Sequence, residues 1–327
     1  MVVLFTCAGR RADIVSAFGA AGATTLATDT SELAPALYVA DRHALVPRVD
    51  DPGYVAALAE LVRVHGAELV VPLTDLDHRV LAARGDELDA LVLLPDLPTV
   101  ERTADKYLAH LFFQEHGIPS PPTWLPEAVP ALLDYPVLVK AREGFGANHI
   151  YRAKDRAELD FFLGYTTEPS MVQQVCQGTE YSIDVFCDLD GVCLNAVPRT
   201  MIHSTGGESV KGMTIKDWDL INFGAHVAET LRLRGPGCIQ CFREADGTHQ
   251  VTDVNPRFGG AFPLPTAAGS RYPELALALA AGEHPEPRLG DFQEGVVMSR
   301  YLAEIILVRN GDGTLAPLER AASAEPS

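Results

Sequence analysis

Short apolar runs alternate with helix-like segments along the first hundred residues. The apolar runs that predict buried strands cover residues 2–5, 24–28, 44–46, 69–73 and 91–94. The segments between them with a helical spacing of apolar residues cover 11–21, 52–65 and 75–84. Strands that alternate with helices predict a parallel sheet covered by helices. The pattern therefore predicts an α/β domain in this part of the chain.

An amphipathic stretch follows and ends in a run rich in glycine and proline. It starts at Thr103-Ala-Asp105-Lys106, continues to His116 and is followed by Gly-Ile-Pro-Ser-Pro-Pro at 117–122. Thr or Asp caps a helix N-terminus, and the Gly-Pro cluster predicts a helix stop with a stiff linker. Lys106 then lies on the first turn, where a cation is unfavourable, so a bound phosphate would explain it. A solvated lysine is the alternative.

A second lysine is delivered by a strand into a glycine-containing loop. The apolar run 136–140 ends in Lys140, and Ala-Arg-Glu-Gly-Phe-Gly follows, with glycines at Gly144 and Gly146. Glycines let backbone N–H groups approach oxygen atoms closely, and an ammonium supplies a point charge, so the arrangement suits phosphate. The loop lacks the Gly-x-x-x-x-Gly-Lys-Ser/Thr spacing of a Walker A motif. Taken alone, it is equally compatible with a plain hairpin.

Two strand-like segments joined by a polar turn come next. Met-Val-Gln-Gln-Val at 171–175 is followed by the strand-like run 178–186. Backbone groups around Gln174 and Val175 could pair with the edge of an adenine, and Glu180 could accept hydrogen bonds from ribose hydroxyls. Without the two lysines upstream, the same pattern indicates only a hairpin.

The most informative stretch is 239–260, which ends in Asp-Val-Asn-Pro-Arg-Phe-Gly-Gly. Successive strand side chains alternate faces, so Asp253 and Asn255 face the same way and offer two oxygen ligands together. Pro256 lacks an N–H donor and ends the strand ladder. A hard dication such as Mg²⁺ prefers carboxylate and amide oxygens together with phosphate, and the neighbouring Arg257 suits an anionic intermediate.

The composition limits the class of protein. The chain has 327 residues, which is ample for roughly two domains. Its formal net charge of −18 argues against a general nucleic-acid binder, whose footprint is basic. No apolar run approaches the roughly 20 residues that span a bilayer. We therefore expect a soluble, cytoplasmic protein without nucleic-acid or membrane partners, in which the positions of the few basic residues are informative.

Three other motifs are set aside. The run Cys-Ala-Gly-Arg-Arg at 7–11 lacks the Gly-x-Gly-x-x-Gly fingerprint, so a nicotinamide enzyme is not predicted. Cys238 and Cys241 have no second Cys or His pair at zinc-site spacing, which predicts buried strand cysteines. Gly-Glu-Ser-Val-Lys at 207–211 departs from Gly-x-Ser-x-Gly at Lys211 and so is not a nucleophile elbow.

The order of these features resembles the ATP-grasp superfamily, across most of the chain. The features that carry the resemblance are Lys106, Lys140 with its glycine loop, the Gln-Gln-Val connector with Glu180, and Asp253-x-Asn255-Pro-Arg257. The resemblance implies an α/β fold, α+β in part, in which an ATP-grasp fold follows a Rossmann-like pre-ATP-grasp domain. It implies that domain at 1–100, a linker helix and lid subdomain at 101–175 and a catalytic subdomain at 176–310. A tail at 311–327 is polar enough not to require order.

The resemblance also implies roles for individual residues. The residues implied to bind ATP are Lys106, Lys140, Gly144 and Gly146 at the phosphates, Gln173, Gln174 and Val175 at the adenine, and Glu180 at the ribose. The implied ligands of Mg²⁺, with Mn²⁺ as the alternative, are Gln240, Asp253 and Asn255. The residues implied to act on the reacting groups are Arg257, Arg199 and Lys211, for which structural ion pairing is the alternative.

One residue departs from the family pattern. Asp253 stands where the family has Glu, whose side chain is one methylene longer. This shorter reach puts in doubt whether one carboxylate can bridge two cations. We therefore expect one strong metal site and a second that forms only with ATP and a carboxylate present.

The function implied is that of an ATP-dependent carboxylate–amine ligase, an enzyme that forms an amide through an acyl phosphate and releases ADP and phosphate. Phosphoryl transfer depends on positioning and charge neutralisation, which explains the lack of a nucleophile motif. The partners implied are a small-molecule carboxylate and an amine of amino-acid type. The alternatives are carboxylation or carbamoyl-phosphate-type chemistry and a non-catalytic ATP sensor. The substrates, the number of metal ions and the oligomeric state, a homodimer among the possibilities, stay open.

Overall fold

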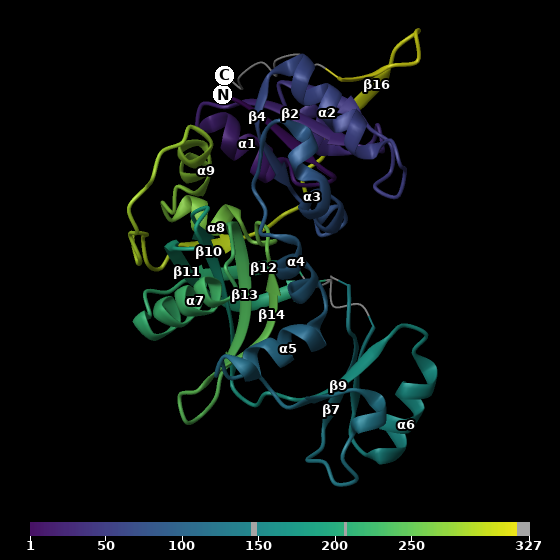
Figure 1. Cartoon of the computed structure of the whole chain (residues 1–327), viewed down its shortest axis with the longest axis vertical. Coiled ribbons are helices and arrows are strands. Elements are labelled where there is room, and N and C mark those ends of the chain that lie inside the picture. Colours follow the sequence, from purple (N-terminus) through teal and green to yellow (C-terminus); the bar gives the residue numbers. More distant parts are fainter. Residues whose placement is uncertain (145–148, 206–207, 319–327) are drawn as a thin grey trace, which may run out of the picture.

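The computed structural model describes residues 1–144, 149–205 and 208–318. Three sheets follow one another along its longest axis (Figure 1). A parallel sheet with helices lies at one end, a six-stranded antiparallel sheet lies in the middle, and a four-stranded antiparallel sheet lies at the other end. The predicted fold class, α/β and in part α+β, is confirmed.

The first sheet is parallel, as its pattern of apolar runs predicts. Its strands lie in the order β3-β2-β1-β4-β5. They are β1 (Val2–Thr6), β2 (Thr24–Asp29), β3 (Arg42–Leu45), β4 (Ala67–Pro72) and β5 (Leu91–Val92). The helices are α1 (Ala12–Ala20), α2 (Tyr54–His65) and α3 (His78–Arg84), with 3-10 turns η1 (Pro35–Tyr38) and η2 (Gly85–Leu88). The strand order reverses between β1 and β4, so the loops after these strands lie where open α/β sheets bind ligands.

Two short helices, α4 (Leu97–Ala104) and α5 (Lys106–Glu115), lead from the first sheet towards the four-stranded sheet (Figure 1). Asp105 separates them in an extended conformation, and its carboxylate caps α5 by accepting hydrogen bonds from the N–H groups of Tyr107 and Leu108. Helix α5 therefore begins at Lys106, which lies on the first turn as predicted.

The four-stranded sheet forms a separately packed unit, which we call the lid (residues 123–174). Its strands lie in the order β6-β9-β7-β8. The elements are β6 (Thr123–Trp124), η3 (Pro126–Ala128), β7 (Val137–Ala141), β8 (Ile150–Ala153), α6 (Arg156–Tyr165) and β9 (Ser170–Gln174). The lid has a small apolar core of its own, built on Val137, Val139, Ala153, Leu159 and Val172.

The middle sheet carries strands in the order β14-β13-β10-β11-β12-β15. They are β10 (Thr179–Cys187), β11 (Cys193–Thr205), β12 (Glu208–Thr214), β13 (Gly235–Arg243), β14 (His249–Asn255) and β15 (Val297–Ser299). Helices α8 (Pro263–Ala267) and α9 (Tyr272–Ala280) lie between this sheet and the first one (Figure 1). Cys238 and Cys241 are both buried in β13, as predicted.

Helix α7 (Trp218–Thr230) covers one face of the middle sheet. It packs so closely on β10 that a Cβ at Gly224 would lie 2.6 Å from the Ile183 side chain. Because strand side chains alternate, Ser182 and Asp184 lie on the other face. That face is therefore free of the helix and can carry a site. Among the described residues no helix has both the length and the apolar character to cross a bilayer.

One apolar core joins the first sheet to the middle sheet. Aromatic rings run across the junction, with centroid distances of 5.2 Å for Phe5 and Phe18, 6.0 Å for Phe18 and Phe258, and 4.7 Å for Phe258 and Phe262. The lid core is separate from it. The two larger sheets are therefore packed as one body, to which the lid is attached.

A hairpin follows the middle sheet, formed by β16 (Leu307–Arg309) and β17 (Leu315–Pro317). The strand β17 lies in the stretch expected not to require order. The Asp312 carboxylate accepts hydrogen bonds from the Thr314 N–H and hydroxyl, which closes the turn between the strands. Arg309 also pairs with Glu32 of the first domain at 2.7 Å. These contacts order part of a segment that is polar in composition.

Candidate functional site

A cavity of about 240 Å³ lies where the first domain, the linking helices, the lid and β14 meet. Four residues predicted for the site line it, namely Lys106, Gly144, Asp253 and Asn255. The first domain contributes residues that the sequence did not single out, namely Asp75, Leu76, His78 and Arg79. The cavity thus brings two predicted phosphate-binding residues and two predicted metal ligands together and adds a wall from the first domain, whereas Lys140 and Gln240 are not among the residues that line it.

Lys106 links the lid to the middle sheet across this cavity. Its Nζ donates a hydrogen bond to the Gly144 carbonyl at 2.9 Å and lies 3.7 Å from Asp253 Oδ1. The start of α5 is fixed to the lid as well, because the Lys106 N–H donates to the Arg142 carbonyl and the Arg142 guanidinium pairs with Asp105. The ammonium is therefore held next to both the lid loop and the predicted metal ligand.

Lys140 approaches the same point from β7. Its side chain is buried, and burial lowers its pKa from the ordinary 10.5 to about 8. The carboxylate of Asp253 opposes this shift, whereas the charge of Lys106 adds to it. Two ammonium groups therefore lie near one carboxylate. A polyanion bound there would relieve their repulsion.

The strand register places Gln240 beside Asp253. Asp253 pairs with Gln240, Gln240 pairs with Ser182, and Ser182 pairs with Arg199. Residues directly opposite each other on neighbouring strands share a face, so these four side chains form one row across the sheet on the face away from α7. The row places the two predicted metal ligands Gln240 and Asp253 side by side, with Ser182 and Arg199 next along it.

Asp253 and Asn255 face the same way, as predicted. The Asn255 amide donates to Asp253 Oδ2 at 3.0 Å. Arg257 lies beside them with partners on every nitrogen. Its Nε donates to Asp75 at 3.0 Å, its Nη2 to Asn255 Oδ1 at 3.0 Å and its Nη1 to the Phe258 carbonyl at 3.2 Å. Through these contacts Arg257 orients Asn255 and links it to Asp75 of the first domain. Arg257 therefore has a structural role that does not depend on substrate.

Arg199 and Lys211 are not among the residues that line the cavity. Arg199 is 3% exposed and donates to the Asp184 carboxylate at 2.7 Å, with the Cys238 sulfur as a further partner. Lys211 is exposed on β12, where the strand register places it opposite Ser299. Arg199 therefore forms a buried ion pair within the middle sheet, and Lys211 lies at the surface of that sheet.

The connector predicted to hold the nucleoside uses its side chains within the lid. Gln173 is buried and donates to the Thr123 hydroxyl at 2.9 Å, and the Gln174 amide donates to the Asp134 carbonyl at 2.7 Å. The Gln174 N–H donates to the Pro122 carbonyl at 2.9 Å, so any contact of this connector with a base would use the remaining backbone groups at Gln174 and Val175. Glu180 is half-buried, and burial raises its pKa, against the opposing charge of Arg199. Gly146 lies outside the described residues.

The donor set fits a magnesium ion that is shared with a phosphate chain. The candidate ligands are one carboxylate and two amides, from Asp253, Asn255 and Gln240. In the part of the chain that the structure describes, no group of three His, Cys, Asp or Glu side chains could hold a metal ion by itself. Mg²⁺ commonly binds through one or two carboxylates plus substrate phosphates. These residues would therefore hold it together with ATP, not alone.

The sequence reasoning missed the wall formed by the first domain. Asp75, His78 and Arg79 follow β4 at the carboxyl edge of the parallel sheet. The signal that could have found them is the topology, because the loop after β4 lies at the point where the strand order reverses. His78 is 3% exposed, and burial lowers its pKa, so it enters this wall as a neutral imidazole at neutral pH.

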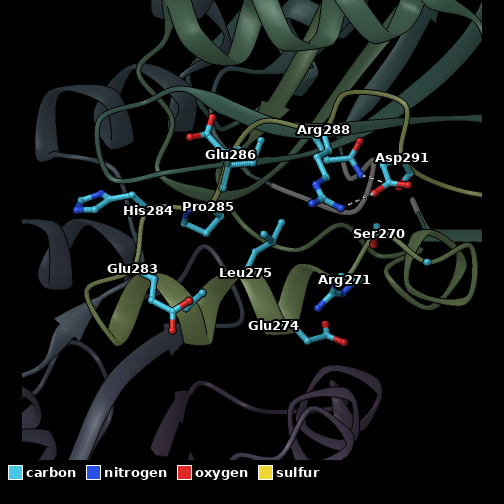
Figure 2. Close-up of a pocket in the computed structure, with 14 residues that line it drawn as sticks. Ser270, Arg271, Glu274, Leu275, Glu283, His284, Pro285, Glu286, Arg288 and Asp291 are labelled. Atoms are coloured by element: carbon cyan, nitrogen blue, oxygen red, sulfur yellow. Dashed lines mark hydrogen bonds and ion pairs between the residues drawn. The ribbon is translucent and has the colours of Figure 1, made fainter.

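A second cavity, of about 340 Å³, lies beside α9. Figure 2 shows its wall formed by Arg271 just before α9, by Glu274 and Leu275 of α9, and by the chain from Glu283 to Asp291. None of the residues predicted to bind ATP or metal lines it. The chemistry predicted from the sequence therefore belongs to the smaller cavity.

Two family models match the chain. The model described as PylC-like, N-terminal domain, matches residues 3–92. The model described as ATP-grasp in the biosynthetic pathway with Ter operon matches residues 166–302. A search of curated proteins finds no match.

Solved structures share the fold. Pyruvate carboxylase from Rhizobium etli has a TM-score of 0.73 and 16% identity. The match covers 90% of this chain but only 30% of the carboxylase chain. The biotin carboxylase domain of the 2-oxoglutarate carboxylase from Hydrogenobacter thermophilus, in complex with MgADP, ADP and bicarbonate, has a TM-score of 0.72 and 17% identity, over 90% of this chain and 73% of that one. An L-amino acid ligase from Bacillus licheniformis has a TM-score of 0.69 and 17% identity, over 90% and 77% of the two chains.

At these identities the structural likeness establishes the fold alone. The family models add a sequence relationship over both the first domain and the middle sheet. Lys106 and Lys140 lie between the two matched stretches, so their predicted roles stay predictions. The family models therefore relate residues 166–302 to an ATP-grasp family and residues 3–92 to the N-terminal domain of PylC-like proteins, and the solved structures show that the chain shares the fold of such enzymes.

Proposed function

We propose that this protein is an ATP-dependent ligase that joins a small-molecule carboxylate to an amine and releases ADP and phosphate. The observation that carries the proposal is the meeting of Lys106 and Asp253 at one cavity, with the buried Lys140 behind them, close enough to interact electrostatically with both. Two ammonium groups beside a carboxylate suit the phosphates of a metal-bound nucleotide. The solved structures with MgADP and the one named as an amino acid ligase support this reading.

Three groups of residues would bind the phosphates, the metal ion and the adenine. Lys106 and Lys140 would bind phosphate oxygens and neutralise the charge that develops during transfer. Asp253, Asn255 and Gln240 would hold Mg²⁺, which neutralises phosphate charge and orients the nucleotide when bound. Backbone groups at Gln174 and Val175 would face the adenine.

The reaction proceeds in two balanced steps. A carboxylate oxygen of the substrate attacks the γ-phosphorus of ATP, and the bond from that phosphorus to the β–γ bridging oxygen breaks, so ADP leaves with the electron pair. The amine then attacks the carbonyl carbon of the acyl phosphate, the bond from that carbon to the phosphate oxygen breaks, and the amine nitrogen loses a proton. Neither step needs a protein nucleophile, in agreement with a site built from charges.

The first experiment measures ADP release from ATP and Mg²⁺ with pooled carboxylic acids, with and without pooled amines, and identifies products by mass. We expect release that requires both pools and a product one water lighter than its two parents. The Lys140→Ala and Asp253→Ala variants should lose turnover. The Lys154→Ala variant, which removes an exposed lysine of the lid, should keep it.

A bicarbonate control tests carboxylation, the chemistry suggested by the neighbouring carboxylase structures. Release of ADP that requires bicarbonate and no acid from the pool would replace the ligase proposal with carboxylation. Tight ATP binding without ADP under any of these conditions would favour a sensor that closes over ATP. Full turnover by either alanine variant would contradict the assignment of the site.

A further inference from the structure

Arg79 of α3 and Glu143 of the lid loop form an ion pair at the edge of the site cavity. Both residues line that cavity. The guanidinium meets the carboxylate in a two-pronged contact, with Nη1 at 2.9 Å from one oxygen and Nη2 at 2.8 Å from the other. Such a fork matches the planar geometry of a carboxylate. The site therefore contains a carboxylate-binding group that is filled by a residue of the protein itself.

The other guanidinium groups near the site are paired with other groups of the protein. Arg257 has a protein partner on each of its three nitrogens, and Arg199 is buried against Asp184. Arg142 is paired with Asp105, the cap of α5. Among the described residues that line the cavity, Arg79 alone carries a guanidinium. It is also accessible, since the side chains of Arg79 and Glu143 are 48% and 52% exposed.

We propose that Arg79 recognises the carboxylate of the acyl-donor substrate, and that Glu143 occupies its place when the substrate is absent. This inference rests on the proposed ligase function and names the subsite for its acid. The cavity puts Arg79 with Lys106, Asp253 and Asn255, so an acid held there faces the phosphate and metal end of the site. Exchanging one carboxylate for another preserves the charge and both hydrogen bonds of the fork. An exposed ion pair is a weak competitor, so the exchange costs little.

A purely structural reading of the pair makes a different prediction. If the ion pair only fastens the lid loop to α3, removing either partner breaks the same contact and has the same effect. If Glu143 stands in for substrate, removing Arg79 abolishes the subsite, whereas removing the charge of Glu143 frees it. The two readings therefore predict changes of opposite sign in the KM for the acid when the charge of Glu143 is removed.

The test compares Arg79→Met with Glu143→Gln and measures KM for ATP and for the acid that supports ADP release in the pooled assay. We expect Arg79→Met to raise KM for the acid by about 10- to 100-fold, because a charge-assisted, two-pronged contact is lost. We expect Glu143→Gln to lower it by about two- to fivefold, because a weak competitor is removed. KM for ATP should stay unchanged in both variants.

Helix α3 offers a matched control. Arg84 and Glu87 form a similar two-pronged pair at 2.7 and 2.9 Å, outside the cavity. Arg84→Met and Glu87→Gln should leave both KM values unchanged. Shifts of the same sign in Arg79→Met and Glu143→Gln, a main effect on ATP, or no effect in Arg79→Met would each overturn the proposal.

A binding measurement separates this proposal from the proposed function. Saturation-transfer NMR with acetate as the probe reports on a carboxylate subsite without turnover. We expect a signal for the wild type, a stronger one for Glu143→Gln and a loss for Arg79→Met with the Arg84→Met control unaffected. This pattern without ADP release would keep the subsite and reject the ligase. Equal acetate signals in Arg79→Met and wild type would reject the subsite even if the ligase assay succeeds.

Discussion

Lys140 has surroundings that predict a pH effect on nucleotide binding. Its pKa is lowered to about 8 by burial, so the ammonium is present below that pH and is lost as the pH rises through it. We expect the Kd for ATP to rise by up to about tenfold per pH unit above pH 8, since binding needs the charge. Lys140→Arg keeps its charge throughout this range, so its Kd for ATP should not rise above pH 8. Direct titration of ATP binding across the pH range checks this, and a break that persists in Lys140→Arg would assign the titration to another group.

Arg257 predicts an effect on metal affinity. It orients Asn255 by donating to its side-chain oxygen, and Asp75 holds Arg257 in turn. Loss of a group that orients a metal ligand typically weakens metal binding by about 10- to 100-fold. We expect Arg257→Lys to raise by that factor the Mg²⁺ concentration needed for ATP binding, because a lysine cannot reproduce the fork.

A matched control for this change is Arg243→Lys, which alters an arginine paired with Asp217 on the same sheet, outside the cavity. Its Mg²⁺ dependence should stay that of the wild type. If Arg257→Lys shifts only the maximal rate and leaves the Mg²⁺ dependence intact, Arg257 contacts the reacting groups instead.

The residues of the site differ in how far the sequence predicts them. Asp253 and Asn255 are neighbours on one face because strand side chains alternate, and a two-residue spacing is enough to see this. Asp75 lies 182 residues from Arg257 in the chain, and no local pattern links them. The sequence allows structural ion pairing for Arg257 but does not reveal Asp75 as its partner, and the pairing of Arg79 with Glu143 is hidden for the same reason.

The lid is an element-sized unit with its own core, and this predicts where a destabilised variant would open. Leu159 is fully buried in the lid core. Leu159→Ala should cost about 2–5 kcal/mol, most of it confined to the lid. Hydrogen exchange should accelerate in residues 123–174 and stay unchanged in the first sheet. Leu132→Ala, at a position 92% exposed in the same lid, is the control. Equal acceleration in all three sheets would show that the lid does not open by itself.

In this chain the spacing of apolar residues predicts buried strands, but it does not predict strands that depend on a particular turn. The strands β1, β2 and β4 lie where the apolar runs predict them, because strands buried on both faces are apolar almost throughout. The edge strand β3 is mostly exposed and begins at Arg42, two residues before its predicted run. The β17 strand was missed because it is only three residues long in a stretch rich in polar residues, Ala and Pro, and the turn that precedes it is closed by hydrogen bonds to Asp312. Local composition describes what a segment can bury, whereas such a turn is fixed by two or three specific side chains.

At the scale of the whole molecule, the shared core predicts that the first and middle sheets unfold together. Phe258 lies at the junction, 2% exposed, between Phe18 and Phe262. Phe258→Ala should lower the free energy of unfolding by about 3–5 kcal/mol. A thermal scan should show one transition for both sheets, shifted to lower Tm. Tyr301→Ala, at a position 86% exposed, should leave Tm unchanged. Two separate transitions in the Phe258 variant would contradict the joint core.

The contact between Arg11 and the Phe258 carbonyl joins residues 247 positions apart, and this has a consequence during synthesis. The apolar face of α1, which carries Ile14, Val15 and Phe18, emerges from the ribosome long before the segment that covers it. At about 5–20 residues per second, the wait lasts roughly 12–50 s. Phe18 also packs on Phe5 of β1, so the part of this face that stays uncovered is the part that meets Phe258, α8 and α9. We expect ribosome-associated chaperones to bind this part until residue 258 has left the exit tunnel.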